Sequence, residues 1–140
     1  MNAQAYDQYK KTNIESIGPG KLLLMLFEGA IRNIDSAKQA ILDKDINLAH
    51  NQIIKTQNII LELISSLDME YEISNQIFYL YEFLFYQLTV ANAQKDLKIL
   101  DEVRGLLSEF HEVWDEANKK AGVVRVQSDT APNQGLNIQG

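Results

Sequence analysis

The spacing of proline is the feature that most constrains how this chain folds. Only two prolines occur in the 140 residues, Pro19 and Pro132. Between residues 21 and 120 the only glycines are Gly29 and Gly105. Because proline and glycine are the main breakers of regular structure, so long a stretch without them is typical of long helices. No segment of this stretch both alternates polar and apolar residues over several positions and sits between turn signals, so no β-sheet is expected.

Apolar residues recur three and four positions apart over four successive segments, the spacing that places them on one face of a helix. The four stripes are Leu23, Phe27, Ala30, Ile34, Ala37 and Ile41; Ile46, Ala49, Ile53, Thr56, Ile60, Leu63 and Leu67; Ile73, Ile77, Leu80, Leu84 and Ala91; and Leu100, Val103, Leu107, Phe110, Trp114 and Ala117. Pro19 suits the first turn of the first helix, and Asp96 is a plausible N-cap for the last. Short connections between amphipathic helices predict an all-α, antiparallel four-helix bundle over residues 18–120.

Two segments flank the predicted bundle. Residues 1–17 are polar with scattered tyrosines and isoleucines, and they lack the apolar core of a signal peptide. Residues 121–140 are rich in Gly, Gln, Asn, Ser and Pro, a composition that favours a flexible, disordered tail. The longest early apolar run, residues 22–27, is far shorter than the roughly 20 residues that span a bilayer. These observations predict a soluble, cytoplasmic protein with a flexible N-terminal segment.

Charge and residue usage exclude several functions. Nineteen acidic residues against 13 basic ones give a net charge of −6, which argues against binding nucleic acid or an anionic membrane. The chain has no cysteine, so it has neither disulfides nor thiolate metal sites. Neither His50 nor His111 has a glutamate three residues before it, as a di-iron bundle requires. We therefore expect no cofactor, no metal and no catalysis. The alternative function is histidine phosphotransfer, in which His50 or His111 of a four-helix bundle would carry the phosphoryl group.

Helical segments two and three carry more apolar surface than one core face needs. From Ile77 to Tyr86 the only residue that is not apolar or aromatic is Glu82. A second stripe lies about 100° around each helix from the first. The residues of these second stripes are Ile54, Gln57, Leu61 and Ile64 on one helix, and Phe78, Tyr81, Phe85 and Leu88 on the other. They predict a groove that receives a partner helix, although a wide core face or a homodimer would give the same pattern.

Several motifs, in order along the chain, resemble the FliS-type flagellin export chaperones. Tyr6 and Tyr9 resemble that family's paired N-terminal tyrosines. Residues 19–30, Pro-Gly-Lys-Leu-Leu-Leu-Met-Leu-Phe-Glu-Gly-Ala, are similar to its signature at the start of the first helix. The remaining matches are Ser65-Ser66-Leu67-Asp68, Leu80-Tyr81, and Ala91-Asn92 followed by Asp96.

The resemblance implies a cytoplasmic, non-enzymatic chaperone that binds the C-terminal segment of flagellin. It would prevent premature polymerisation and help deliver flagellin to the flagellar export apparatus. The apolar groove described above is then the expected client site. The resemblance also implies that the N-terminal segment covers this site when no client is present, with Tyr6, Tyr9 and Ile14 as its anchors.

Overall fold

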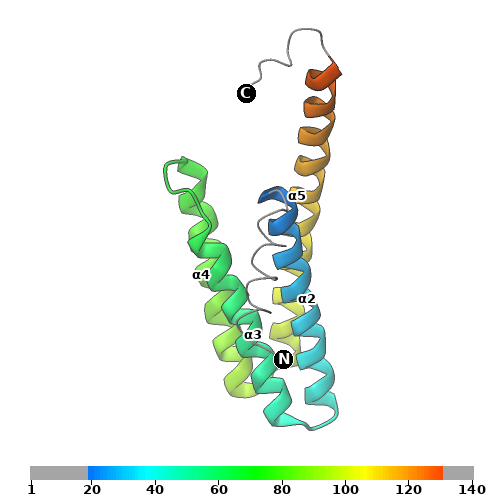
Figure 1. Cartoon of the computed structure of the whole chain (residues 1–140). Coiled ribbons are helices and arrows are strands. Elements are labelled where there is room, and N and C mark those ends of the chain that lie inside the picture. The colour runs from blue at the N-terminus through cyan, green and yellow to red at the C-terminus, as the bar shows by residue number, and fades with distance from the viewer. Residues whose placement is uncertain (1–18, 131–140) are drawn as a thin grey trace, which may run out of the picture.

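The computed structural model describes residues 19–130, with side chains over 20–120, and within that range the chain forms four α-helices and no strand. Their bounds are α2 (Pro19–Leu42), α3 (Ile46–Ser65), α4 (Glu72–Gln94) and α5 (Leu97–Thr130). The helices run alternately up and down (Figure 1), which confirms the predicted antiparallel four-helix bundle. None of the described helices is long and apolar enough to cross a membrane.

The order of the helices around the bundle is fixed by their packing. Helix α2 packs against α3 and α5, and α4 packs against the same two helices. The diagonal pairs are therefore α2 with α4 and α3 with α5, an arrangement that hydrophobic periodicity alone leaves open. Each interface joins helices that are neighbours in sequence, except the one between α2 and α5, which closes the ring.

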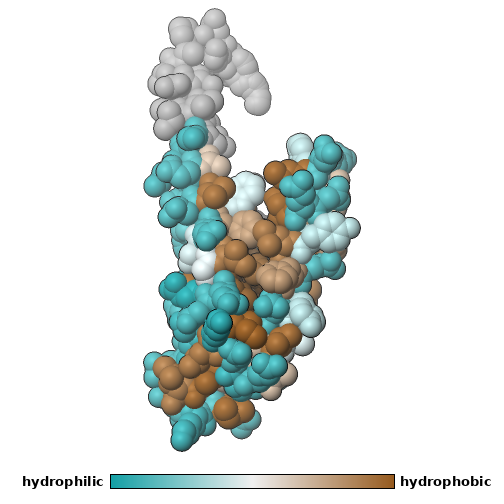
Figure 2. All heavy atoms as spheres, turned by 180° about the vertical axis from the view of Figure 1, so that it is seen from behind, coloured by the Kyte–Doolittle hydropathy of each residue, from teal (hydrophilic) through white to brown (hydrophobic). Residues whose placement is uncertain are grey.

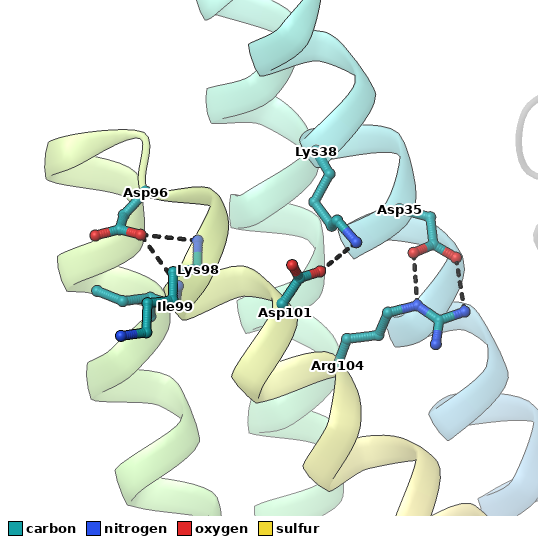
Figure 3. A network of polar contacts seen from close by, with 7 residues as sticks. All are labelled: Asp35, Lys38, Asp96, Lys98, Ile99, Asp101 and Arg104. Atoms are coloured by element: carbon teal, nitrogen blue, oxygen red, sulfur yellow. Dashed lines mark hydrogen bonds and ion pairs between the residues drawn. The ribbon is translucent and has the colours of Figure 1, made fainter.

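Short polar turns connect the helices. Lys44, between α2 and α3, adopts a left-handed backbone with φ 63°, and so does Lys95, which ends α4 with φ 52°. The Asp45 side chain accepts a hydrogen bond from a backbone amide in the first turn of α3. As predicted, Asp96 caps α5: its Oδ1 atom accepts the amides of Lys98 and Ile99 at 2.8 and 3.1 Å (Figure 3).

The core is closed at one end of the bundle and open at the other. From Phe27 to Ala37 the predicted stripe is buried, with Phe27, Ala30, Ile34 and Ala37 all 0% exposed, and Ile41 at its end packs partly buried against the core. At the opposite end of the core, α2 begins and α4 follows its turn from α3 (Figure 1). The side chains there that are only partly buried are Leu23, Leu26, Ile77, Leu80, Phe110 and Trp114. Because apolar side chains remain partly exposed at this open end, it is the natural place for an apolar binding site.

Two ion pairs join α2 to α5 on the outer surface (Figure 3). Arg104 donates from Nε and Nη2 to the two carboxylate oxygens of Asp35 at 2.6 and 3.1 Å, and one turn away Lys38 pairs with Asp101. Exposed pairs of this kind contribute little stability. The bidentate geometry of Arg104 on Asp35 does fix the register of α5 against α2.

The last helix is longer than the sequence analysis predicts. The expected boundary is near Lys120, but α5 continues to Thr130, so residues 121–130 of the predicted flexible tail are helical. Gly122 is the only breaker between Lys120 and Pro132, and a single glycine lowers helix stability by about 1 kcal/mol without ending the helix. The predicted N-terminal segment, and the tail beyond Thr130, lie outside the described residues.

Candidate functional site: an apolar cleft between α4 and α5

A cleft opens between α4 and α5 at the open end of the core. Its volume is about 450 Å³. It is lined by Ile73, Ile77 and Leu80 of α4 and by Leu106, Glu109, Phe110, Val113 and Trp114 of α5. Glu109 is the one lining residue with a charge. Seen from behind, apolar side chains gather in a hollow between two arms of the molecule (Figure 2).

Phe110 forms a fixed floor for this cleft. Its ring stacks on Phe27 of α2, with centroids 5.8 Å apart and an interplanar angle of 5°. It also meets the ring of Tyr81 on α4 at 5.7 Å and 49°. Because these partners come from two other helices and are buried, the floor is held by the core itself. The cleft is therefore largely preformed, which lowers the entropic cost of binding.

Apolar side chains on the walls remain in contact with water. Ile73 is 62% exposed and Val113 is 65% exposed, and they lie on opposite walls of the cleft. Single exposed apolar residues are ordinary, but a contiguous cluster around a cleft indicates a binding surface. These residues are available to a partner at no cost to the core.

The cleft continues along α4 and α5 into a second hollow of about 380 Å³. This hollow is lined by Phe83 and Gln87 of α4 and by Glu102, Val103, Gly105, Leu106 and Glu109 of α5. The two hollows share Leu106 and Glu109. A Cβ atom added to Gly105 would meet nothing within 4 Å, so the space above that residue is open. We call the two hollows together the α4–α5 groove.

On α4 the structure divides the two predicted stripes differently from the sequence analysis. Tyr81 and Leu88, assigned from sequence to the client groove, are instead buried in the core at 2% and 0% exposure. Leu84 and Ala91 are buried as predicted, whereas Ile73 is exposed in the cleft. The buried face of α4 draws on both stripes because each lies about 50° from the line that bisects them.

On the α3 side, a glutamine bridges the two helices of the predicted groove. Gln57 is only 7% exposed, and its Nε2 atom donates to the Phe85 carbonyl at 3.2 Å and to Thr89 Oγ1 at 2.9 Å. These bonds tie α3 to α4 where the sequence analysis places an open groove. The hollow beside Gln57 has a mostly polar lining, which consists of His50, Ile54, Gln57, Thr89, Asn92, Ala93 and Lys95.

The other predicted groove residues lie on or near the outer surface of α3 and α4. Ile54 is 38% exposed and Leu61 is 49% exposed. Ile64, Phe78 and Phe85 are partly buried, and Ile64 and Phe85 pack against the core. Their role in client binding stays a prediction. Tyr6, Tyr9 and Ile14, the predicted cap residues, lie outside the described residues.

The described side chains offer little for catalysis. No group of three or more histidine, aspartate and glutamate side chains within the described range is arranged to hold a metal ion. The Nδ1 atom of His50 shares a hydrogen bond with the Asn92 amide at 2.9 Å, and His111 Nε2 meets a Glu28 oxygen at 2.8 Å. Burial raises the pKa of Tyr81 to about 12, which makes its phenol a poor general base at neutral pH.

Comparisons with known proteins point in one direction. A family model described as "Flagellar protein FliS" matches residues 2–121. The flagellar secretion chaperone FliS of Bacillus subtilis is 34% identical over 112 residues, covering 80% of this chain and 84% of the relative. That of Salmonella typhimurium is 32% identical over 122 residues, covering 84% and 90%.

A solved structure has the same fold. It is titled "Crystal structure of flagellar chaperone from bacteria", and it matches with a TM-score of 0.70 at 18% identity. The match covers 84% of this chain and 97% of that structure. At this identity the likeness speaks for the four-helix architecture alone.

Proposed function

Since the chain belongs to the FliS family of flagellar proteins, whose members are secretion chaperones rather than enzymes, we propose that it binds the C-terminal segment of flagellin in the cytoplasm. Binding would keep that segment from polymerising early and would present flagellin to the flagellar export apparatus. Family membership favours this function over histidine phosphotransfer. The proposal is carried by the α4–α5 groove, an apolar surface without catalytic groups.

The groove suits an amphipathic helix. From Glu102 to Trp114, its wall on α5 is about 18 Å long at 1.5 Å per residue, the length of roughly three turns of a bound helix. Covering the exposed parts of Ile73, Phe83 and Val113 contributes roughly 3 to 5 kcal/mol before association costs, given about 1.5 to 3 kcal/mol for each fully buried side chain. The apolar stripe of the client adds a comparable amount. The sum is of the same order as the cost of association, so only part of it appears as affinity.

Calorimetric titration with the C-terminal segment of flagellin from the same organism tests this function. We expect saturable one-to-one binding with a negative heat-capacity change, the mark of apolar burial. Val113→Asp should weaken binding strongly, because a client would have to cover the new carboxylate. The matched control is Leu61→Asp on α3, which also changes an exposed aliphatic residue and should leave binding unchanged.

Both variants should stay folded, because each side chain is about half exposed or more in the wild type, and circular dichroism checks this. Equal affinity of wild type and Val113→Asp for the client would mean that the client does not bind in the α4–α5 groove. Loss of binding in Leu61→Asp alone would favour the groove between α3 and α4 that the sequence analysis predicts. Absence of binding by the folded wild type would contradict the proposed client.

The N-terminal segment is proposed as a removable cover for the client site. Residues 1–17 precede Pro19, and α2 begins at the open end of the core. Tyr6, Tyr9 and Ile14 supply apolar anchors. If they occupy the client site in the free protein, binding must displace them, and this lowers the apparent affinity. Deletion of residues 1–17 should therefore tighten client binding or promote self-association, and a deletion that changes neither would contradict the cover.

A further inference from the structure

A row of glutamates follows the α4–α5 groove on the α5 side. Glu102 and Glu109 both line it, and Glu109 borders both of its hollows. Glu116 comes seven residues after Glu109, and seven residues are close to two helical turns, so it continues the same row. All three side chains are exposed. We call Glu102, Glu109 and Glu116 the acidic ridge.

Basic side chains are missing from the groove itself. Helix α4 contains no lysine or arginine, and neither hollow is lined by one. On α5, Arg104 is turned toward α2, where it pairs with Asp35, and Lys119 pairs with Asp115. Among the side chains described over residues 20–120, no ion pair joins the acidic ridge to a cation. Lys98 and Lys120 come four residues before Glu102 and four after Glu116, so they lie at the two ends of the ridge. Glu109, at its centre, presents negative charge beside an apolar floor.

We infer that the α4–α5 groove selects an amphipathic client helix whose apolar stripe is flanked by lysine or arginine. This inference rests on the function proposed above and adds the charge pattern of the client. A helix that lays its apolar face on Phe110 and Leu106 brings its flanking positions beside the acidic ridge. Basic flanks gain attraction there, and acidic flanks meet repulsion, so the ridge sets specificity and register rather than most of the affinity.

A pair of designed peptides isolates this charge effect. Both are ~18 residues long, enough to span the groove at 1.5 Å per residue, and both carry the same leucine and isoleucine stripe. One peptide has lysine and the other glutamate at the flanking positions. We expect the lysine peptide to bind the full-length protein about tenfold more tightly at low salt, since several surface charge pairs each contribute modestly. The preference should shrink as salt screens the exposed charges.

Variants of the protein separate the ridge from the net charge of the whole molecule. Glu109→Gln should reduce the preference for the lysine peptide by about threefold, as expected for one partly exposed charge pair. Glu62→Gln on α3 is the control. It changes the net charge by the same amount at an exposed site, on a helix that lies diagonally across the bundle from α5, and the preference should be unaffected.

Several outcomes would overturn the inference. Equal binding of the two peptides, or tighter binding of the glutamate peptide, would contradict it directly. An equal loss of preference in Glu109→Gln and Glu62→Gln would assign the effect to net charge rather than to the ridge. If the flagellin segment binds at Val113 but neither peptide binds, the charge pattern fails while the proposed function stands. If the flagellin segment also fails to bind, the proposed function fails with it.

Discussion

Alkaline pH should destabilise the bundle through the ionisation of Tyr81, because a buried tyrosine resists ionisation in the folded state and an exposed one does not. The Tyr81 side chain is 2% exposed, and burial raises its pKa from the ordinary 10 to about 12. The folded state therefore holds the phenol proton more tightly than the unfolded state does. Stability is complete below about pH 10 and is lost as the pH rises toward about 12, because only the unfolded phenol ionises readily in that window.

The magnitude follows from the size of the shift. Each unit of pKa difference corresponds to 1.36 kcal/mol, so at about pH 11 the free energy of unfolding should fall by about 1.4 kcal/mol because of Tyr81 alone. Other tyrosines and lysines also titrate there. Tyr81→Phe keeps those groups and removes only this hydroxyl, so the difference between the two proteins isolates the contribution of Tyr81.

Urea denaturation of both proteins at about pH 8 and pH 11 measures this contribution. The wild type should lose about 1.4 kcal/mol more than Tyr81→Phe between the two conditions. An equal loss in both would mean that the Tyr81 hydroxyl is hydrated in solution. That result would refute the burial of Tyr81 and would restore the sequence-based assignment of its stripe to an open groove.

Four other substitutions test the packing, each by the free energy of unfolding in urea. Leu84→Ala should cost about 2 to 5 kcal/mol because it leaves a cavity at a fully buried site, whereas Leu61→Ala should cost under about 1 kcal/mol at a half-exposed one. Asp96→Ala should cost about 1 kcal/mol by removing the cap of α5. Gln57→Ala should cost about 1 to 3 kcal/mol by removing two part-buried hydrogen bonds between α3 and α4, and an unchanged stability would show that α3 and α4 are not joined there.

The sequence is sufficient to predict the buried face of a helix whose polar and apolar faces are distinct. In α2 after the apolar run at residues 22–27, charged and polar residues set off one apolar stripe, and the structure buries Phe27, Ala30, Ile34 and Ala37 as predicted. The cap at Asp96 is also predictable, because it depends on residues adjacent in the chain. Both features are decided locally, so the identities of the neighbouring helices do not alter them.

Which face of α4 is buried does not depend on its own sequence alone. Both of its stripes are apolar, and periodicity cannot choose between Ile73 and Tyr81 as the core residue. The choice depends on partners distant in sequence: Phe110 receives Tyr81, and Gln57 bonds to the backbone and side chain of α4. Gln57, a polar residue within the second stripe of α3, indicated this arrangement, because a buried amide between two helices has to find hydrogen-bond partners on the neighbouring helix.

The sequence also contained an indication of the cleft, in an apolar residue that lies outside the core stripe of the last helix. Val113 is apolar but stands off the core stripe of the last helix, next to Phe110 and Trp114 on that stripe. An amphipathic surface helix normally places polar residues at such positions. Three neighbouring apolar residues there widen the apolar face beyond what the core can cover, and in the structure all three line the cleft.

Site-specific photo-crosslinking tests most directly whether the client lies between α4 and α5. A photoreactive amino acid is placed at Val113 in one protein and at Leu61 in another, two exposed positions on diagonally opposed helices. Each is irradiated with the flagellin C-terminal segment. The α4–α5 groove predicts a crosslinked product from position 113 and none from position 61. A product from position 61 alone would contradict it.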